Sequence, residues 1–110
     1  MANTFKNALS ASIGTSAVDV YTVPSATTTT VIGATVANRT ASTINVDVTV
    51  TDTSATVTTY LVKGAPVPAN GALVVVGGDQ KVVLEATDKI TVTSDTATSA
   101  DATISVLEQS

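Results

Sequence analysis

The chain has 110 residues, a net charge of −4 and a high content of β-branched residues, since 45 of them are Thr, Val or Ile. It contains no Cys, His or Trp, which excludes a disulfide framework, thiolate or imidazole metal ligands, and catalysis by Cys or His. The length suits one small domain, and five scattered basic residues with only three aromatic residues argue against nucleic-acid binding.

The first fifteen residues carry little pattern. A short turn at Phe5–Leu9 is the nearest approach to helical periodicity, and no apolar stretch follows Lys6 that would indicate a secretory signal. We therefore divide the chain into residues 1–15, either an arm that orders on docking or a frayed terminus, and residues 16–110, the folded domain. No apolar run approaches the roughly 18 residues that a membrane span needs.

Eight short strands are expected after this segment. The clearest is Ile44–Thr51, where Ile or Val alternates with polar residues, so that one face is buried and the other meets water. The other seven combine alternation with short β-branched runs: Val18–Val23, Thr30–Asn38, Thr56–Val62, Ala72–Val76, Lys81–Leu84, Lys89–Thr93 and Ala102–Val106. Within them, Val74–Val76 is expected to be buried on both sides, and Thr27–Thr30 to be a strand entry or exposed loop.

Turn residues separate these strands. Asn70-Gly71 predicts a hairpin, since both residues tolerate a positive φ, while Pro66 and Pro68 place the preceding stretch in a loop or at a sheet edge. Short strands with turns between them and almost no helix predict an all-β fold. We expect a single-domain antiparallel β-sandwich of about eight strands, Ig-like or jelly-roll-like, with a small barrel as the alternative.

No residue pattern predicts catalysis or a bound cofactor. No Ser-x-x-Lys pair is present, and the nine acidic residues fall mostly in expected turns or on wet strand faces. Calcium would need an acidic loop, and Asp95 and Asp101, six residues apart, are better explained as solvated carboxylates. Asn38-Arg39-Thr40 matches a glycosylation sequon, but a turn accounts for it equally well. We therefore expect no catalytic, cofactor-binding or metal-binding residue, and no cofactor.

The expected surface is weakly charged. Sheet proteins protect their edge strands with lysine, proline or inward charges, and this chain has four lysines and three prolines for about eight strands. The surface must then consist mostly of Thr, Ser and Ala. We infer that a partner or a second copy of the chain covers some of the edges.

Motifs along nearly the whole chain resemble small virion proteins encoded by tailed bacteriophages. They are strand and turn signatures rather than a catalytic fingerprint: Met1–Asn7, Val20–Pro24, Val31–Gly33, Ala37–Asn38, Ala65–Gly71, Leu84–Ile90 and Ile104–Glu108. The resemblance implies a non-enzymatic capsid decoration (cement) protein that stabilises the head, or alternatively a neck or tail-fibre component. A glycan-binding or host-surface module is the alternative from another class.

The same resemblance implies the partners and the location. The partners would be the major capsid protein or other virion proteins, together with further copies of the chain in a homo-oligomer or symmetric array. Neither nucleic acid nor a membrane is expected as a partner. The protein would reside in the virion after synthesis in the host cytoplasm.

Overall fold

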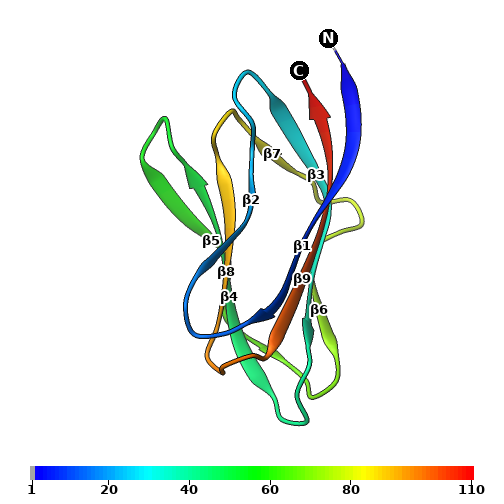
Figure 1. Ribbon diagram of the computed structural model, residues 1–110, viewed down its shortest axis with the longest axis vertical. Helices are drawn as coiled ribbons and strands as arrows, with labels where there is room; N and C mark the ends of the chain where they lie inside the picture. Colours follow the sequence, from blue (N-terminus) through cyan, green and yellow to red (C-terminus); the bar gives the residue numbers. More distant parts are fainter. Residues whose placement is uncertain (1) are drawn as a thin grey trace.

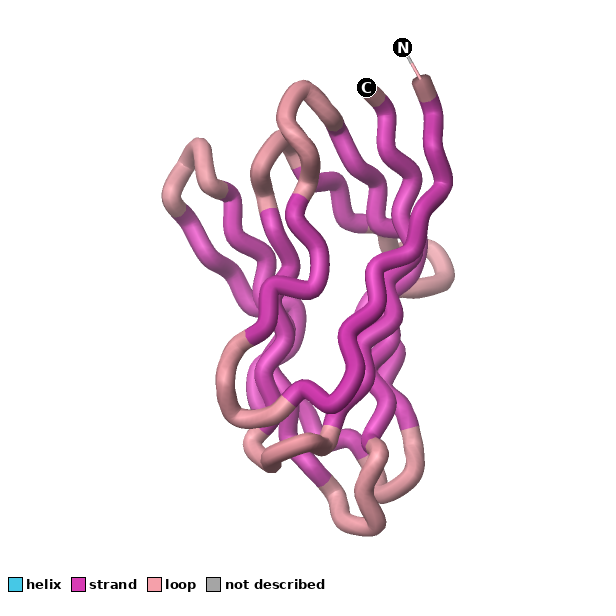
Figure 2. The backbone as a smooth tube through the Cα atoms, in the orientation of Figure 1, coloured by secondary structure: helices cyan, strands magenta, loops and turns pink. Residues whose placement is uncertain are grey.

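Nine β-strands make up the fold in the computed structural model, which describes residues 2–110 and contains no helix within that range. The strands are β1 (Asn3–Ile13), β2 (Val18–Thr22), β3 (Thr28–Asn38), β4 (Ile44–Asp52), β5 (Val57–Val67), β6 (Ala72–Val76), β7 (Val82–Leu84), β8 (Lys89–Ser94) and β9 (Ala100–Gln109). Figures 1 and 2 show that they form two layers. Across the described residues, no helix is long and apolar enough to cross a membrane.

Both layers are antiparallel sheets. Sheet A has the order β1-β9-β3-β6, with the short β7 also paired to β3, and sheet B has the order β2-β8-β4-β5. The chain crosses repeatedly between the two sheets. Within sheet A, the last strand β9 lies between β1 and β3 (Figure 1). At the open end of the β1–β9 pair, Ala2 and Ser110 exchange two backbone hydrogen bonds, of 2.8 and 3.0 Å.

The core lies between the sheets and consists of aliphatic side chains on alternate strand positions. In β4, Ile44, Val46 and Val48 are each 1% exposed, and the polar residues between them face outward. Ile104 and Val106 of β9 meet them from sheet A with equally little exposure. Such side chains are stiff at χ1 and pack well on a pleated surface, which explains why Val and Ile dominate the sequence.

The predicted β-sandwich is confirmed, and all eight predicted strands are present within a few residues of their expected bounds. The ninth strand, β1, was not expected. The stretch Phe5–Leu9, which came nearest to helical periodicity, is part of this strand and pairs in register with β9 from Leu107 to Thr103. Most of the segment 1–15 is therefore an edge strand of sheet A, while Met1 lies outside the described residues.

Two expectations about the third quarter of the chain are also wrong. The Asn70-Gly71 turn forms as predicted, with φ of 56° at Asn70, but it joins β5 of sheet B to β6 of sheet A and closes no hairpin. Val74 is not buried on both sides: it is 65% exposed, whereas Val76 is 1% exposed. The reason is that β6 is an edge strand of sheet A with one uncovered face. Thr28 begins β3, which confirms a strand entry.

Candidate functional site

Most of the large apolar side chains that reach solvent gather on the outer face of sheet A, the face turned away from the core. Within residues 2–110 seven such side chains are exposed. Five of them belong to sheet A: Phe5, Leu9, Ile32, Val74 and Val83. The remaining two lie on β5 of sheet B. Exposed apolar side chains gathered on one face are typical of interaction surfaces.

Strand register arranges these side chains in rows across sheet A. The first row consists of Phe5, Leu107, Thr30 and Val83, each opposite the next. The second row consists of Leu9, Thr103, Thr35 and Val74. Since directly opposite side chains contact one another, each row forms a continuous strip with apolar ends.

Small residues separate the two rows and leave a shallow hollow of about 340 Å³. Asn7 is opposite Ser105, which in turn is opposite Gly33, so that no large side chain fills the middle of the face. Phe5 and Ile32 form part of the hollow's wall. We call this feature the Ser105 hollow.

Charge is nearly absent from the same face. Among the described residues of the sheet A strands, the register turns one ionisable side chain outward, Asp101 near the start of β9. It accepts the backbone N–H of Ser12 at 2.9 Å and lies 3.7 Å from Nε of Arg39. Lys6 also lines the hollow, and its ammonium group lies 3.1 Å from Glu108. The rest of the central face offers threonine, serine, asparagine and apolar side chains.

The outer face of sheet B differs in character. Lys89 lies 3.2 Å from Asp19, whose other oxygen accepts the Thr91 hydroxyl at 2.8 Å. The hydrogen bond from Thr91, aided by Lys89, holds the pKa of Asp19 below its usual value. On β4, Asp47 accepts the backbone N–H of Gly64 at 2.6 Å. Fixed charges therefore occupy the middle of this face.

The sheet edges are also unequally protected. On β5 two register shifts against β4, a proline at 66 and a positive φ of 59° at Gly64 interrupt regular pairing. By contrast, β1 keeps one continuous register from Asn3 to Ser10 against β9, and its single irregularity follows Ser10. Lys6 is the one basic residue in that strand. The β1 edge is consequently the longest regular edge in the described part of the chain.

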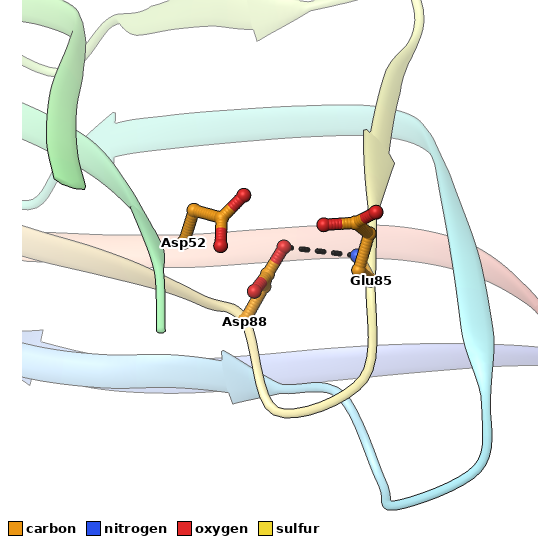
Figure 3. Close-up of side chains that lie close together, drawn as sticks. All are labelled: Asp52, Glu85 and Asp88. Atoms are coloured by element: carbon orange, nitrogen blue, oxygen red, sulfur yellow. Dashed lines mark hydrogen bonds between the residues drawn. The ribbon is translucent and has the colours of Figure 1, made fainter. Parts of the chain in front are cut away.

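Three carboxylates form the second candidate site. Asp52 at the end of β4 meets Glu85 and Asp88 from the turn between β7 and β8, and one oxygen of each lies within 4.8 Å of the others (Figure 3). Oxygen ligands of this kind suit a hard cation such as calcium. Sequence patterns do not indicate this cluster, because Asp52 is more than thirty residues away from the turn that holds the other two carboxylates.

Local backbone contacts account for the cluster. Asp88 is 4% exposed, and its two oxygens accept the N–H groups of Glu85 at 2.9 Å and Thr53 at 3.2 Å. It is thus a buried cap of the turn between β7 and β8. Asp52 accepts the Ala55 N–H at 3.0 Å, and this bond holds the pKa of Asp52 below its usual value. Because these carboxylates already serve the turns, we assign no metal to them.

A buried carboxylate joins the two sheets. Glu108 of β9 accepts the hydroxyl of Tyr21 at 2.6 Å and lies 3.1 Å from Nζ of Lys6. Tyr21 comes from sheet B, and its oxygen also lies 2.8 Å from the hydroxyl of Thr29. Burial and the neighbouring Glu108 raise the pKa of Tyr21 to about 12. The Tyr21 hydrogen bond and then Lys6 hold the pKa of Glu108 below its usual value.

The residues singled out from the sequence lie apart from the carboxylate cluster. Asp95 accepts hydrogen bonds from the Asn45 N–H at 3.1 Å and the Thr96 hydroxyl at 2.9 Å, so it shares no partner with Asp101. Asn38 is 4% exposed, and its amide nitrogen donates to the carbonyls of Ser42, Val67 and Pro68. This side chain fixes the turns around it, as the turn interpretation of the sequon requires.

A comparison of the chain with protein-family models, with curated proteins and with solved structures finds no match. The outer face of sheet A is therefore the candidate functional site, because exposed apolar side chains, aligned register and scarce charge coincide there.

Proposed function

We propose that the protein is a non-enzymatic structural protein of a bacteriophage virion, a capsid decoration protein that assembles with other subunits through the outer face of sheet A. One observation carries the proposal. Five of the seven exposed large apolar side chains of the described residues lie on that face, which also holds a hollow with one ionisable residue in its lining, Lys6, paired with Glu108.

Such a face is suited to binding other protein subunits in an assembly. Apolar contact provides attraction without requiring a specific charged partner, at roughly 25 cal/mol for each Å² removed from water. A single contact of modest size is weak, but many identical contacts on a symmetric particle bind with high avidity. The threonine and serine rows between the apolar side chains can satisfy backbone groups of a partner surface.

The resemblance to virion proteins of tailed bacteriophages supports the same proposal from the sequence, and it specifies the location as the virion. The carboxylate cluster offers no competing function, because Asp52 and Asp88 already bind backbone N–H groups. Its position at one end of sheet B also separates it from the apolar face.

The decisive measurement is the copy number of the protein in purified virions of the phage that encodes it, from stained-gel densitometry. We expect a copy number comparable to that of the major capsid protein. A handful of copies would instead favour a neck or tail component. Absence from virions combined with binding to a glycan array would overturn the proposal in favour of a host-surface module.

A matched pair of variants then tests the face itself. Val74→Asp places a charge on the outer face of sheet A, and Tyr60→Asp places the same charge at a comparably exposed position on β5, since these residues are 65% and 54% exposed. Incorporation of the Val74 variant into virions should fall at least tenfold, while the Tyr60 variant should be incorporated normally. Equal incorporation of both would exclude this face as the docking surface.

A further inference from the structure

We propose that two copies of the chain pack together through the outer faces of sheet A, with Phe5 of each copy seated in the Ser105 hollow of the other. This inference rests on the proposed function only in treating the outer face as a protein-binding surface. It goes further by naming the partner on that face as a second copy of the chain.

Shape complementarity is the first argument. A two-fold contact uses the same patch on both copies, so a protruding side chain and a hollow on one face suffice for a reciprocal fit. Phe5 is 75% exposed, the most exposed of the large apolar side chains, and it stands at the wall of the hollow. Ser105 lines the hollow beside it, and its register partner on β3 is Gly33, which has no side chain.

Charge is the second argument for a second copy as the partner. The chain carries a net charge of −4, so two copies repel one another unless the contact avoids their acidic groups. Sheet A meets this condition, since Asp101 lies at one end of its outer face and is accompanied by Arg39. Sheet B does not, because Asp19 and Asp47 lie on its outer face.

Area is the third argument. Three strands of roughly ten residues (β1, β9 and β3), with the short β6 and β7 together beside β3 and strands about 4.8 Å apart, cover a face of about 600 Å² per copy. A face-to-face pair would then bury roughly 1,200 Å² in total, at the lower limit for specific protein interfaces. We therefore expect a reversible dimer whose population depends on concentration.

Sedimentation velocity of the full chain over a range of concentrations tests the dimer. We expect the wild type to change from monomer to dimer, and Phe5→Ser and Ser105→Lys each to weaken the dimer at least tenfold. Both residues are exposed, so their replacement leaves the fold intact, which circular dichroism verifies. Thr93→Lys adds the same charge to the outer face of sheet B and serves as the matched control, with no expected effect.

A cross-linking experiment locates the contact independently of affinity. The chain has no cysteine, so Thr103→Cys introduces a single thiol beside the hollow, and Thr93→Cys introduces one on sheet B. A short bis-maleimide should link the Thr103 variant into dimers and leave the Thr93 variant monomeric. Efficient linking of the Thr93 variant alone would overturn the proposal, because it would place the contact on the other sheet.

The outcomes separate this inference from the proposed function. A wild type that stays monomeric at all concentrations but is present in virions at high copy number would exclude the dimer and retain the decoration role. A dimer that Phe5→Ser and Ser105→Lys disrupt, in a protein absent from virions, would support the inference and reject that role.

Discussion

The outer faces of both sheets are rich in threonine, but the residues between the threonines are charged on sheet B and apolar on sheet A. On sheet B, Asp19 and Lys89 pair across the strands and Thr91 donates to the carboxylate. The outer face of sheet A instead carries exposed aliphatic and aromatic side chains, of which Phe5 is the most exposed. Threonine therefore favours strand structure in both sheets. Whether an outer face is suited to solvent or to a protein partner depends on the charged or apolar residues placed between the threonines.

The largest expected effect is on the free energy of unfolding, and it distinguishes the inward-facing Val76 of β6 from the outward-facing Val74. Val76→Ala should lower the free energy of unfolding by about 2 to 3 kcal/mol, because it removes two buried methyl groups and leaves a cavity. Val74→Ala should change it by less than about 0.5 kcal/mol, because that side chain is 65% exposed. Urea denaturation measures both. Similar losses in the free energy of unfolding for the two variants would mean that Val74 on the outer face stabilises the monomer, which would argue against its serving mainly as a contact with a partner.

The next effect compares a buried carboxylate with an exposed one. Glu108→Gln should cost about 1 to 2 kcal/mol at pH 7, because it weakens charge-assisted bonds to Tyr21 and Lys6. Asp19→Asn on the outer face of sheet B should cost less than about 1 kcal/mol, since exposed ion pairs contribute little. Chemical denaturation of the two variants at one ionic strength measures both losses in the free energy of unfolding. A larger loss for Asp19→Asn than for Glu108→Gln would contradict the prediction.

The pH dependence of stability follows from the same group. The pKa of Glu108 in the folded protein lies below its ordinary value of 4.5, so its contribution is complete above that pH and is lost as the pH falls below it. Glu108→Gln should therefore flatten the acid limb of the stability curve. For Tyr21 the folded pKa is raised from 10 to about 12, so stability should fall as the pH rises above 10. Thermal melts from pH 2 to 11 measure both limbs.

A smaller effect concerns association rather than folding. Thr103→Lys on sheet A should weaken self-association about tenfold, which corresponds to about 1.4 kcal/mol, because it places a like charge on both copies in the contact. Thr49→Lys, at an outward position of β4, should leave association unchanged. Sedimentation equilibrium gives the two dissociation constants. A stronger effect of Thr49→Lys would mean that the copies associate through the outer face of sheet B.

The smallest effect is expected at the carboxylate cluster at the end of sheet B. Millimolar calcium, or its removal with EDTA, should change the melting temperature by less than about 1 °C, because Asp88 already accepts two backbone N–H groups. A metal that bound the folded state would stabilise it by mass action. A calcium-dependent rise that Glu85→Gln abolishes would therefore identify a metal site that we have not assigned.

The sequence was sufficient to predict the strands that bury a complete face. In Ile44–Thr51 the alternation follows directly from burial of one side of β4, and the same holds for Ala102–Val106 of β9. Strand β1 was missed because neither of its faces is uniformly apolar. Phe5 and Leu9 point to solvent, while Lys6 points inward at the edge, and among its residues only Ile13 is fully buried.

The candidate sites were harder to predict, because they depend on register and topology. Extending the alternation of Ala102, Ile104 and Val106 by one step would have placed Glu108 on the inner side, where it is found. No local signal could have brought Asp52 next to the turn at residues 85–88, since the contact depends on how the strands pair. The error at Asn70-Gly71 has the same origin, because a turn sequence specifies local backbone and not which sheet the next strand joins.

The position of β9 in the middle of sheet A constrains how the molecule folds. Its neighbours β1 and β3 are paired through it, so sheet A cannot close until residues 100–109 have left the ribosome. Closing the β1–β9 pair then joins residues that are far apart in sequence, such as Asn3 and Gln109, and such non-local pairing makes folding slow. Until that step β1 and β3 lack the strand that lies between them, and apolar surface exposed in such an intermediate favours aggregation.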